Sequence, residues 1–293
     1  MIIRCLRPHL NNDEIPILQK RVYFCLLCIC KYHSTLLLTS MLSDIQSMLV
    51  ESILSISVVS KKYRLKCLSY LSRSLDPGNE AHIQFILQVL PEVVLCVKDS
   101  SKKVRAICLA IVTRFSDVMA HSTVSYQRND GSTHQASLRE YLGLLTACLT
   151  AQSTHMQAAA VLSLAVVLRY HWKTNPCEDI LLDVLHCFYE LMKMGNRELV
   201  KAGLRYIRIA CRLLNEDDLM TEIDAIMEHV MATGSENKNK FRTTIRSILE
   251  VLLRRVGEEE VRSLMPEEDL ALLTNILRME RRKENTKKHD VRD

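Results

Sequence analysis

The chain has 293 residues, enough for one large domain or two ordinary ones, and its formal net charge is +5. Only 7 Gly, 6 Pro and 5% aromatic residues stand against abundant Leu, Arg, Lys, Glu and Ala, which is typical of long helices and not of sheets. With 48% hydrophobic residues the chain can bury a continuous core, which excludes a disordered protein.

Cysteine content and the length of the apolar runs bear on the compartment. Eleven cysteines are scattered through apolar stretches, where a thiol behaves as a small hydrophobic group, so we expect a reducing compartment. The longest apolar runs, Val22–Cys30 and Ala158–Leu168, are shorter than the roughly 20 residues that a membrane-spanning helix needs. We therefore expect a soluble protein. A signal-peptide core at the first run is disfavoured, because that run starts late and no small-residue cleavage pattern comes directly after it.

The first 59 residues predict helices over 13–32 and 35–59, in poor register with the later repeats, as degenerate repeats or as a cap. From residue 60 onward, an apolar residue followed by a basic or polar one opens successive amphipathic segments. These openings are Tyr63-Arg64, Val104-Arg105, the weaker Met156-Gln157, Val200-Lys201 and Phe241-Arg242. Their spacing of about 40 to 50 residues is that of HEAT or armadillo repeats.

Each opening begins the second helix of a pair. The partner helices are predicted at 82–98, 138–150, 178–194 and 217–233, and turn residues fall between helices at Asp76-Pro77-Gly78-Asn79, Thr174-Asn175-Pro176, Met194-Gly195-Asn196 and Gly234-Ser235-Glu236-Asn237. Residues 121–137 are polar, contain a glycine and lack an apolar period, so they predict a long, mobile surface loop. The predicted fold is an all-α, HEAT/armadillo-type helical-repeat solenoid over 60–265.

The C-terminal segment is predicted to be a basic helix and tail. Residues 258–265 and 267–282 have helical patterns, and 283–293 predict a charged, frayed end. The expected domains are therefore an N-terminal cap or degenerate repeats (1–59), the solenoid (60–265) and the basic end (266–293).

Basic side chains form two stripes in the last third of the chain. The first is Arg197, Lys201, Arg205, Arg208 and Arg212, the second is Lys238, Arg242 and Arg246, and Arg281 and Arg282 lie in the end helix. At about 100° per residue each stripe occupies one helix face, and second helices of neighbouring repeats stack side by side, so the stripes should adjoin. Such a surface would bind RNA phosphates or an acidic protein. Tyr206 lies beside the first stripe, but aromatic residues are too few there to predict base stacking.

Structural interpretations compete with this one. Single basic residues mostly keep a helix face solvated, and the arginines at the openings (Arg64, Arg105 and Arg242) would then pair with carboxylates of the adjacent repeat. The basic end helix is either a solvated terminus, a nuclear-targeting patch or a second RNA anchor.

Candidate sites for chemistry are weak. Cys25, Cys28, Cys30 and His33 have no second Cys/His pair at zinc-finger spacing and lie in an apolar helix, so buried structural cysteines are favoured over a metal site. Phosphate-loop, nucleophile-elbow, His-Glu-x-x-His and dinucleotide motifs are absent from the sequence. We therefore expect no enzyme, no cofactor and no small-molecule substrate.

Two segments carry a family resemblance. LPEVVLCVKDSSKKVR (Leu90–Arg105) and the closing run from Phe241 through SLMPEEDLALLTNILRMERRKE (Ser263–Glu284), in order with the helices and loop between them, are similar to the ribosomal RNA processing protein 12-like family of HEAT-repeat ribosome-assembly factors. The resemblance covers residues 60–284. Members of that family are much longer, so the chain would correspond to the C-terminal part of one, as a fragment or a reduced member.

The resemblance implies a nuclear and nucleolar factor, shuttling to the cytoplasm, that binds pre-ribosomal RNA and assembly proteins of the small-subunit precursor and takes part in maturation or in export with the nuclear export machinery. From the short apolar runs we expect no membrane partner. Two alternatives stay open, a HEAT-type nuclear transport adaptor and a protein-only scaffold.

Overall fold

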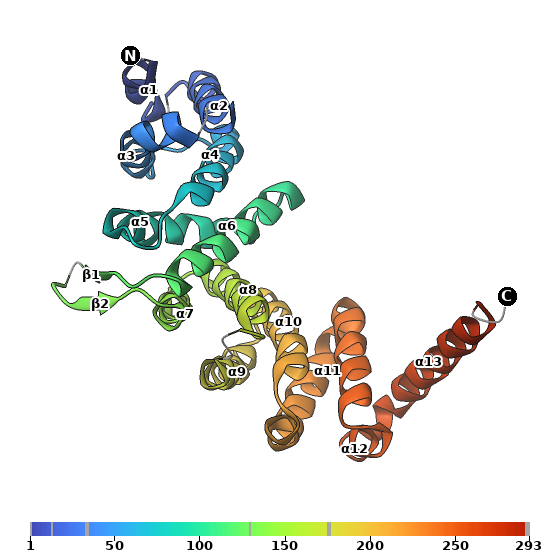
Figure 1. Ribbon diagram of the computed structural model, residues 1–293. Helices are drawn as coiled ribbons and strands as arrows, with labels where there is room; N and C mark the ends of the chain where they lie inside the picture. The colour runs from blue at the N-terminus through green and yellow to red at the C-terminus, as the bar shows by residue number, and fades with distance from the viewer. Residues whose placement is uncertain (1, 13, 33–34, 129, 175–176, 291–293) are drawn as a thin grey trace. The chain divides into compact units, whose positions relative to one another are not determined.

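The computed structural model describes residues 2–12, 14–32, 35–128, 130–174 and 177–290, with side chains in these ranges except at 2–4, 35–40, 234–240 and 283–290. The chain divides into two compact units, Met1–His171 and Trp172–Asp293. Helices make up most of each (Figure 1), which confirms the predicted all-α helical-repeat fold. None of the helices in the described ranges is long and apolar enough to cross a membrane.

The first unit is built of paired helices. They are α1 (Ile2–Leu10), α2 (Pro16–Tyr32), α3 (Thr35–Glu51), α4 (Val58–Leu71), α5 (Glu80–Cys96), α6 (Lys102–Ala120), α7 (Leu138–Ala147) and α8 (Thr154–His171), with short 3-10 turns at Ser72–Ser74 and Cys148–Thr150. Helices α2, α4, α6 and α8 pack side by side as one layer, α1 and α5 pack against it, and α3 contacts both α1 and α5. The second helices predicted at the first three openings, α4, α6 and α8, therefore lie next to one another.

The apolar period explains this layer. In α6, Val104, Cys108, Ile111, Val112 and Phe115 recur every three or four residues, and all five are buried. The predicted turns at 76–79 and 194–196 are confirmed, since Asn79 and Asn196 cap the helices that come after them by accepting backbone N–H bonds at 2.9 Å. Asn175 and Pro176 of the third predicted turn lie outside the described residues.

The second unit contains α9 (Glu178–Lys193), α10 (Arg197–Leu213), α11 (Glu216–Arg255), α12 (Glu258–Ser263), a 3-10 turn (Glu267–Asp269) and α13 (Leu270–Asp290). Helix α10 packs against both α9 and α11, while α12 and α13 contact α11. Gly203 permits the close crossing of α9 and α10, because a Cβ atom there would lie 2.7 Å from Met192 Sδ and 3.2 Å from Phe188 Cδ1.

The predicted loop at 121–137 is wrong, because this segment forms an antiparallel hairpin. Strands β1 (Ser125–Gln127) and β2 (Thr133–Gln135) pair with Tyr126 opposite His134, and Gly131 has a positive φ of 81° in the turn. The Tyr126 side chain is buried and its hydroxyl donates to Glu140 Oε1 at 2.6 Å. Tertiary burial of one tyrosine thus anchors a strand pair that has no apolar period of its own.

Two predicted helix ends also differ. The backbone stays helical through Gly234-Ser235-Glu236-Asn237, so α11 continues from Glu216 to Arg255 without the expected break. None of these residues is proline, and the cost of a glycine in a helix, about 1 kcal/mol, does not by itself end one. Helix α13 likewise continues to Asp290, beyond the end predicted at Arg282.

Candidate nucleic-acid interface

The first predicted stripe occupies the solvent side of α10. Arg197, Lys201, Arg205 and Arg212 are exposed, and Arg208 is half-buried. The opposite side of the helix is buried at Leu199, Leu204, Ile207, Ala210 and Cys211. Packing of this apolar side against α9 and α11 fixes the direction of the cations, because residues three and four apart share one face.

Helices α10 and α11 run beside each other over the second stripe. Arg208 Nη1 lies 3.4 Å from Ser247 Oγ, and farther along both helices Arg255 donates to three carbonyl oxygens at the C-terminal end of α10, those of Cys211, Arg212 and Leu214 at 3.3, 3.3 and 2.7 Å. Both sets of contacts advance in the same chain direction, so the helices are parallel here. The structure therefore brings the two stripes together where Arg208 adjoins the turn of α11 that contains Arg246.

The charges of the second stripe are not equivalent. Arg242 is exposed, whereas Arg246 is half-buried and donates to Glu250 Oε1 at 3.1 Å, which neutralises it. The side chain of Lys238 lies outside those that the structure describes. Among the described residues, no carboxylate pairs with the five exposed cations Arg197, Lys201, Arg205, Arg212 and Arg242. We call these five residues the basic ledge.

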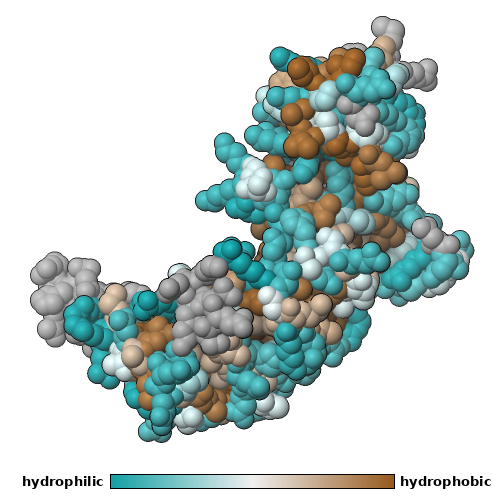
Figure 2. Space-filling model, turned by 180° about the vertical axis from the view of Figure 1, so that it is seen from behind, coloured by the Kyte–Doolittle hydropathy of each residue, from teal (hydrophilic) through white to brown (hydrophobic). Residues whose placement is uncertain are grey.

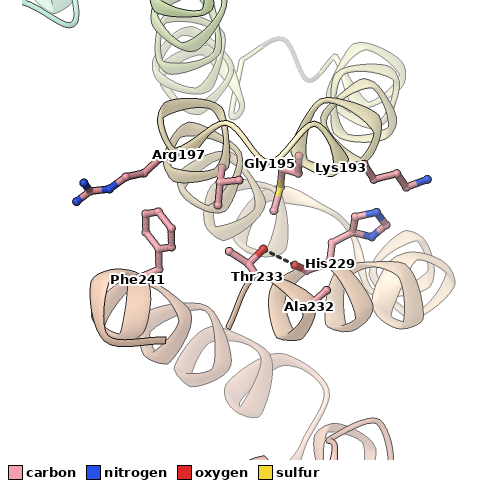
Figure 3. A pocket seen from close by; sticks show the side chains of 9 residues that line it. Lys193, Gly195, Arg197, His229, Ala232, Thr233 and Phe241 are labelled. Atoms are coloured by element: carbon pink, nitrogen blue, oxygen red, sulfur yellow. Dashed lines mark hydrogen bonds between the residues drawn. The ribbon is translucent and has the colours of Figure 1, made fainter. Parts of the chain in front are cut away.

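A pocket of about 190 Å³ opens beside the N-terminal end of the ledge. Figure 3 shows it between the α9–α10 turn and α11, with Phe241 directed toward it and the Arg197 side chain leaving its rim. Lys193 and His229 also line it, and no carboxylate does. Lys193 is paired with Glu190 at 2.7 Å, so Arg197 is the lining cation that the pocket shares with the ledge.

The predicted end-helix residues Arg281 and Arg282 are exposed on α13. They come directly after Glu280, whose carboxylate lies 3.5 Å from Arg254 Nε near the end of α11. This ion pair places the beginning of the basic end segment at the C-terminal end of α11.

Several residues have structural roles instead. Tyr206 is fully buried and donates to the Leu181 carbonyl oxygen at 3.0 Å, so its ring is not available to a ligand on the stripe. Arg64 is also fully buried and pairs with Glu92 in α5, which confirms the structural interpretation for that opening. Arg105 instead caps backbone, since its Nη1 donates to the carbonyl oxygens of Asp99 and Ser100 at 2.8 and 2.7 Å.

The cysteine-rich segment lies in α2. Cys30 is buried as predicted, but Cys25 is exposed and Cys28 half-buried, so the expectation of burial is wrong for Cys25. Apolar residues lie on most faces of α2, and the neighbouring helices cover only part of it, so Cys25 stays exposed. His33 lies outside the described residues. Within the described parts of the chain, His, Cys, Asp and Glu do not form a group that could hold a metal ion.

A surface formed by α2, α4 and α6 escaped the sequence analysis. Residues of these helices, among them Phe24 of α2 and Ile107 of α6, line a second pocket that contains basic and aromatic side chains. The sequence signal was the lack of carboxylates in α2 and α4, whose seven basic residues face no acidic residue within either helix. The stripe search failed there because it looked along single helices.

Comparison of the sequence with known proteins finds curated relatives. No protein-family model matches the chain. The chain is 29% identical to the human RRP12-like protein over 94% of this chain and 20% of the relative. It is 27% identical to the Gallus gallus RRP12-like protein over 96% and 21%, and 24% identical to ribosomal RNA-processing protein 12 of Saccharomyces cerevisiae over 92% and 22%. The chain thus spans about one fifth of the length of the curated relatives it matches.

Solved structures give weaker likenesses. A designed armadillo repeat protein is 15% identical, with a TM-score of 0.41 over 86% of this chain and 100% of that chain. Computationally designed armadillo repeat proteins for modular peptide recognition are 15% identical, with a TM-score of 0.41 over 86% and 99%. Scores this low add nothing to the fold that the helices themselves show. The sequence matches, which cover more than nine tenths of the chain, confirm the predicted resemblance: the chain is similar in sequence to members of the ribosomal RNA processing protein 12-like family.

Proposed function

We propose that the chain is a non-catalytic ribosome-biogenesis factor that binds pre-ribosomal RNA and proteins during maturation or export of the small subunit. The observation that supports RNA binding is the basic ledge, five exposed cations on adjoining faces of α10 and α11 without carboxylate partners among the described residues. The printed names of the relatives connect them to ribosomal RNA processing. Such a factor would work in the nucleus and nucleolus and shuttle to the cytoplasm.

The dimensions of the ledge fit an RNA backbone. From Arg197 to Arg212 the helix rises about 22 Å, enough for contact with phosphates of several successive nucleotides. Cations on a rigid helix bind phosphates without regard to sequence, so the contact would depend on the shape of the RNA. Each phosphate contact adds about 0.9 to the salt slope, and five contacts would weaken binding roughly 500-fold between 50 and 200 mM salt.

The test is binding of the full chain to a structured ribosomal RNA fragment across a salt series, with an unrelated duplex of equal length beside it. The variant Lys201→Gln, Arg205→Gln, Arg242→Gln removes three ledge cations and should reduce the salt slope by about 3. The matched control is Arg246→Gln, Arg254→Gln, Arg262→Gln, which removes three cations that already pair with Glu250, Glu280 and Glu258. It should change the slope much less.

Three outcomes distinguish the candidates. Preference for the ribosomal fragment over the duplex supports recognition of RNA shape. Equal salt slopes for the ledge variant and the control variant would show that the ledge does not contact the RNA. Failure to bind RNA at moderate salt, with RNA-independent capture of acidic partner proteins through the ledge, would favour a transport adaptor or a protein-only scaffold.

A further inference from the structure

The first unit has an uneven distribution of charge between its helices. In the layer of α2, α4, α6 and α8, Asp117 is the single acidic residue, whereas α2, α4 and α6 together carry eleven lysines and arginines. Two of these cations pair with carboxylates, Arg64 with Glu92 and Lys61 with Asp99, and Arg105 donates to backbone carbonyl oxygens. The remainder leave the exposed side of the layer strongly positive.

A pocket of about 340 Å³ lies in this layer between α2, α4 and α6. It is lined by three cations, Lys31, Lys66 and Arg73, and by three aromatic side chains, Phe24, Tyr32 and Tyr70. Carboxylates do not contribute to its lining. Its volume is within the range of pockets that hold small organic groups, of roughly 300 to 1,000 Å³.

Cations and rings alternate around the pocket. Lys31 Nζ lies 4.4 Å from the centroid of the Tyr32 ring, and the Arg73 guanidinium lies 5.0 Å from that of Tyr70. Phe24 meets Tyr63 edge to face, with their ring centroids 5.7 Å apart, and Lys20 Nζ lies 5.9 Å from the Tyr63 centroid. Lys31, Lys66 and Arg73 form no ion pair with a carboxylate among the described residues. Tyr32 and Tyr70 thus each have a cation beside the ring, and Lys31 Nζ also donates a hydrogen bond to the Tyr32 hydroxyl at 2.7 Å.

Binding of a phosphate would change these contacts between cations and rings. An exposed cation–π contact is weaker than a charge-assisted hydrogen bond from the same lysine or arginine to phosphate oxygen. A phosphate would therefore draw Arg73 away from the Tyr70 ring, and Lys31 away from the Tyr32 ring and hydroxyl, and leave aromatic faces for the base attached to the same nucleotide. Alternation of cations with aromatic faces is the arrangement by which single-stranded nucleic acid is bound without sequence preference.

The N-terminal helices also expose apolar surface. Ile17, Leu54 and Val58 are exposed by 72%, 95% and 83%, and Figure 2 shows hydrophobic side chains gathered over this part of the molecule. None of these three residues lines the basic pocket, whose lining combines aromatic rings with cations.

We propose that the pocket between α2, α4 and α6 binds single-stranded RNA, with bases stacked on Tyr32, Tyr70 and Phe24 and phosphates held by Lys31, Lys66 and Arg73. The choice of RNA rests on the proposed function, but the site does not use the basic ledge. In a duplex the base faces are already stacked on one another and are not open to protein rings. The aromatic rings of the pocket therefore favour single-stranded RNA. An acidic peptide would use the cations and leave the rings without a specific role.

The experiment measures the anisotropy of a labelled, unstructured 12-nucleotide RNA with the full chain across a salt series. Tyr32→Ala, Tyr70→Leu removes two stacking rings while keeping an apolar group at the half-buried position of Tyr70. We expect it to weaken binding at least about 5-fold without changing the salt slope, since one lost stack accounts for that much. Lys31→Gln, Lys66→Gln, Arg73→Gln should lower the slope by about 2, at roughly 0.7 for each phosphate contact.

Two control variants separate the sites. Tyr170→Ala removes an exposed ring of α8 that does not line the pocket and should leave the affinity within about twofold. The ledge variant Lys201→Gln, Arg205→Gln, Arg242→Gln should weaken the structured fragment but not the oligonucleotide. A ledge variant that binds the structured fragment as tightly as the wild-type chain, while the pocket variants lose the oligonucleotide, would reject the proposed function and keep this inference.

Three results would overturn the inference. One is an unchanged oligonucleotide affinity in the two-tyrosine variant with its helical circular dichroism intact. Another is equal affinity for an abasic oligonucleotide of the same length, which would reduce the contact to charge alone. The third is displacement of the RNA by an acidic peptide of equal charge at equal concentration, which would assign the pocket to a protein partner.

Discussion

The guanidinium of Arg64 forms two parallel hydrogen bonds with the carboxylate of Glu92, at 2.7 and 2.8 Å. The same guanidinium donates to Ser52 Oγ at 3.0 Å and to the Tyr23 hydroxyl at 3.3 Å. Because Tyr23 lies in α2, Arg64 in α4 and Glu92 in α5, one fully buried cation joins three helices of the first unit. Burial of a charge is costly unless its hydrogen-bonding groups are satisfied, and here they are.

Breaking this pair should destabilise the first unit strongly. Glu92→Gln leaves the Arg64 charge buried without its counter-ion, which typically costs about 3–5 kcal/mol. For a unit of this size, the thermal midpoint falls by roughly 2–4 °C for each kcal/mol. A thermal scan monitored by circular dichroism measures the change. Glu51→Gln is the matched control, because its exposed pair with Arg7 should leave the midpoint nearly unchanged. Equal midpoints for the two variants would contradict the role of Arg64.

The hairpin should loosen in acid. Burial by itself would raise the pKa of Glu140, but hydrogen bonds from Tyr126 and Arg128 and the charge of Arg128 hold this pKa below its ordinary value of 4.5. A carboxylate with a lowered pKa in the folded state stabilises it above pH 4.5, and this contribution is lost as the pH falls from 4.5 toward the folded-state pKa. Amide hydrogen exchange of Ser125–Gln127 and Thr133–Gln135, corrected for the intrinsic pH dependence, should show protection lost over that range. Glu140→Gln should remove the pH dependence. A wild-type hairpin that keeps full protection well below the folded-state pKa would contradict this linkage.

Two helical glycines should respond oppositely to alanine. Gly143→Ala meets no atom within 4 Å, so a helix former replaces a flexible residue and stability should rise by about 0.5–1 kcal/mol. Gly203→Ala adds the same helix preference but places Cβ 2.7 Å from Met192 Sδ at the crossing of α9 and α10. Overpacking costs about 1–3 kcal/mol, part of which a flexible methionine relieves, so the net change should be a loss. Thermal unfolding of both variants beside the wild type checks the difference in sign, and a stabilised Gly203→Ala would show that α9 and α10 separate without cost.

The spacing of apolar residues along the sequence predicted the positions of the helices well. The partner helices expected at 178–194 and 82–98 are α9 (Glu178–Lys193) and α5 (Glu80–Cys96), each within two residues. The solvent side of α10 was also predictable, because spacing by three and four residues fixes which side chains share a face. The hairpin escaped, although Asp130-Gly131 is a known turn signal, because its stability comes from Tyr126 and Glu140 and not from alternating apolar residues.

The sequence by itself determined that this protein is a helical repeat with basic faces, since helix formation and the side that a residue occupies depend on neighbours within one or two turns. Tertiary structure decided which cations remain available. Arg64 resembled the other opening arginines in sequence, and only the fold brings Glu92 of α5 to it. Lys31, Lys66 and Arg73 line one pocket only because α2, α4 and α6 pack side by side. Such pairing depends on how closely and in what register helices approach, and the burial of their apolar faces over the whole unit sets that approach.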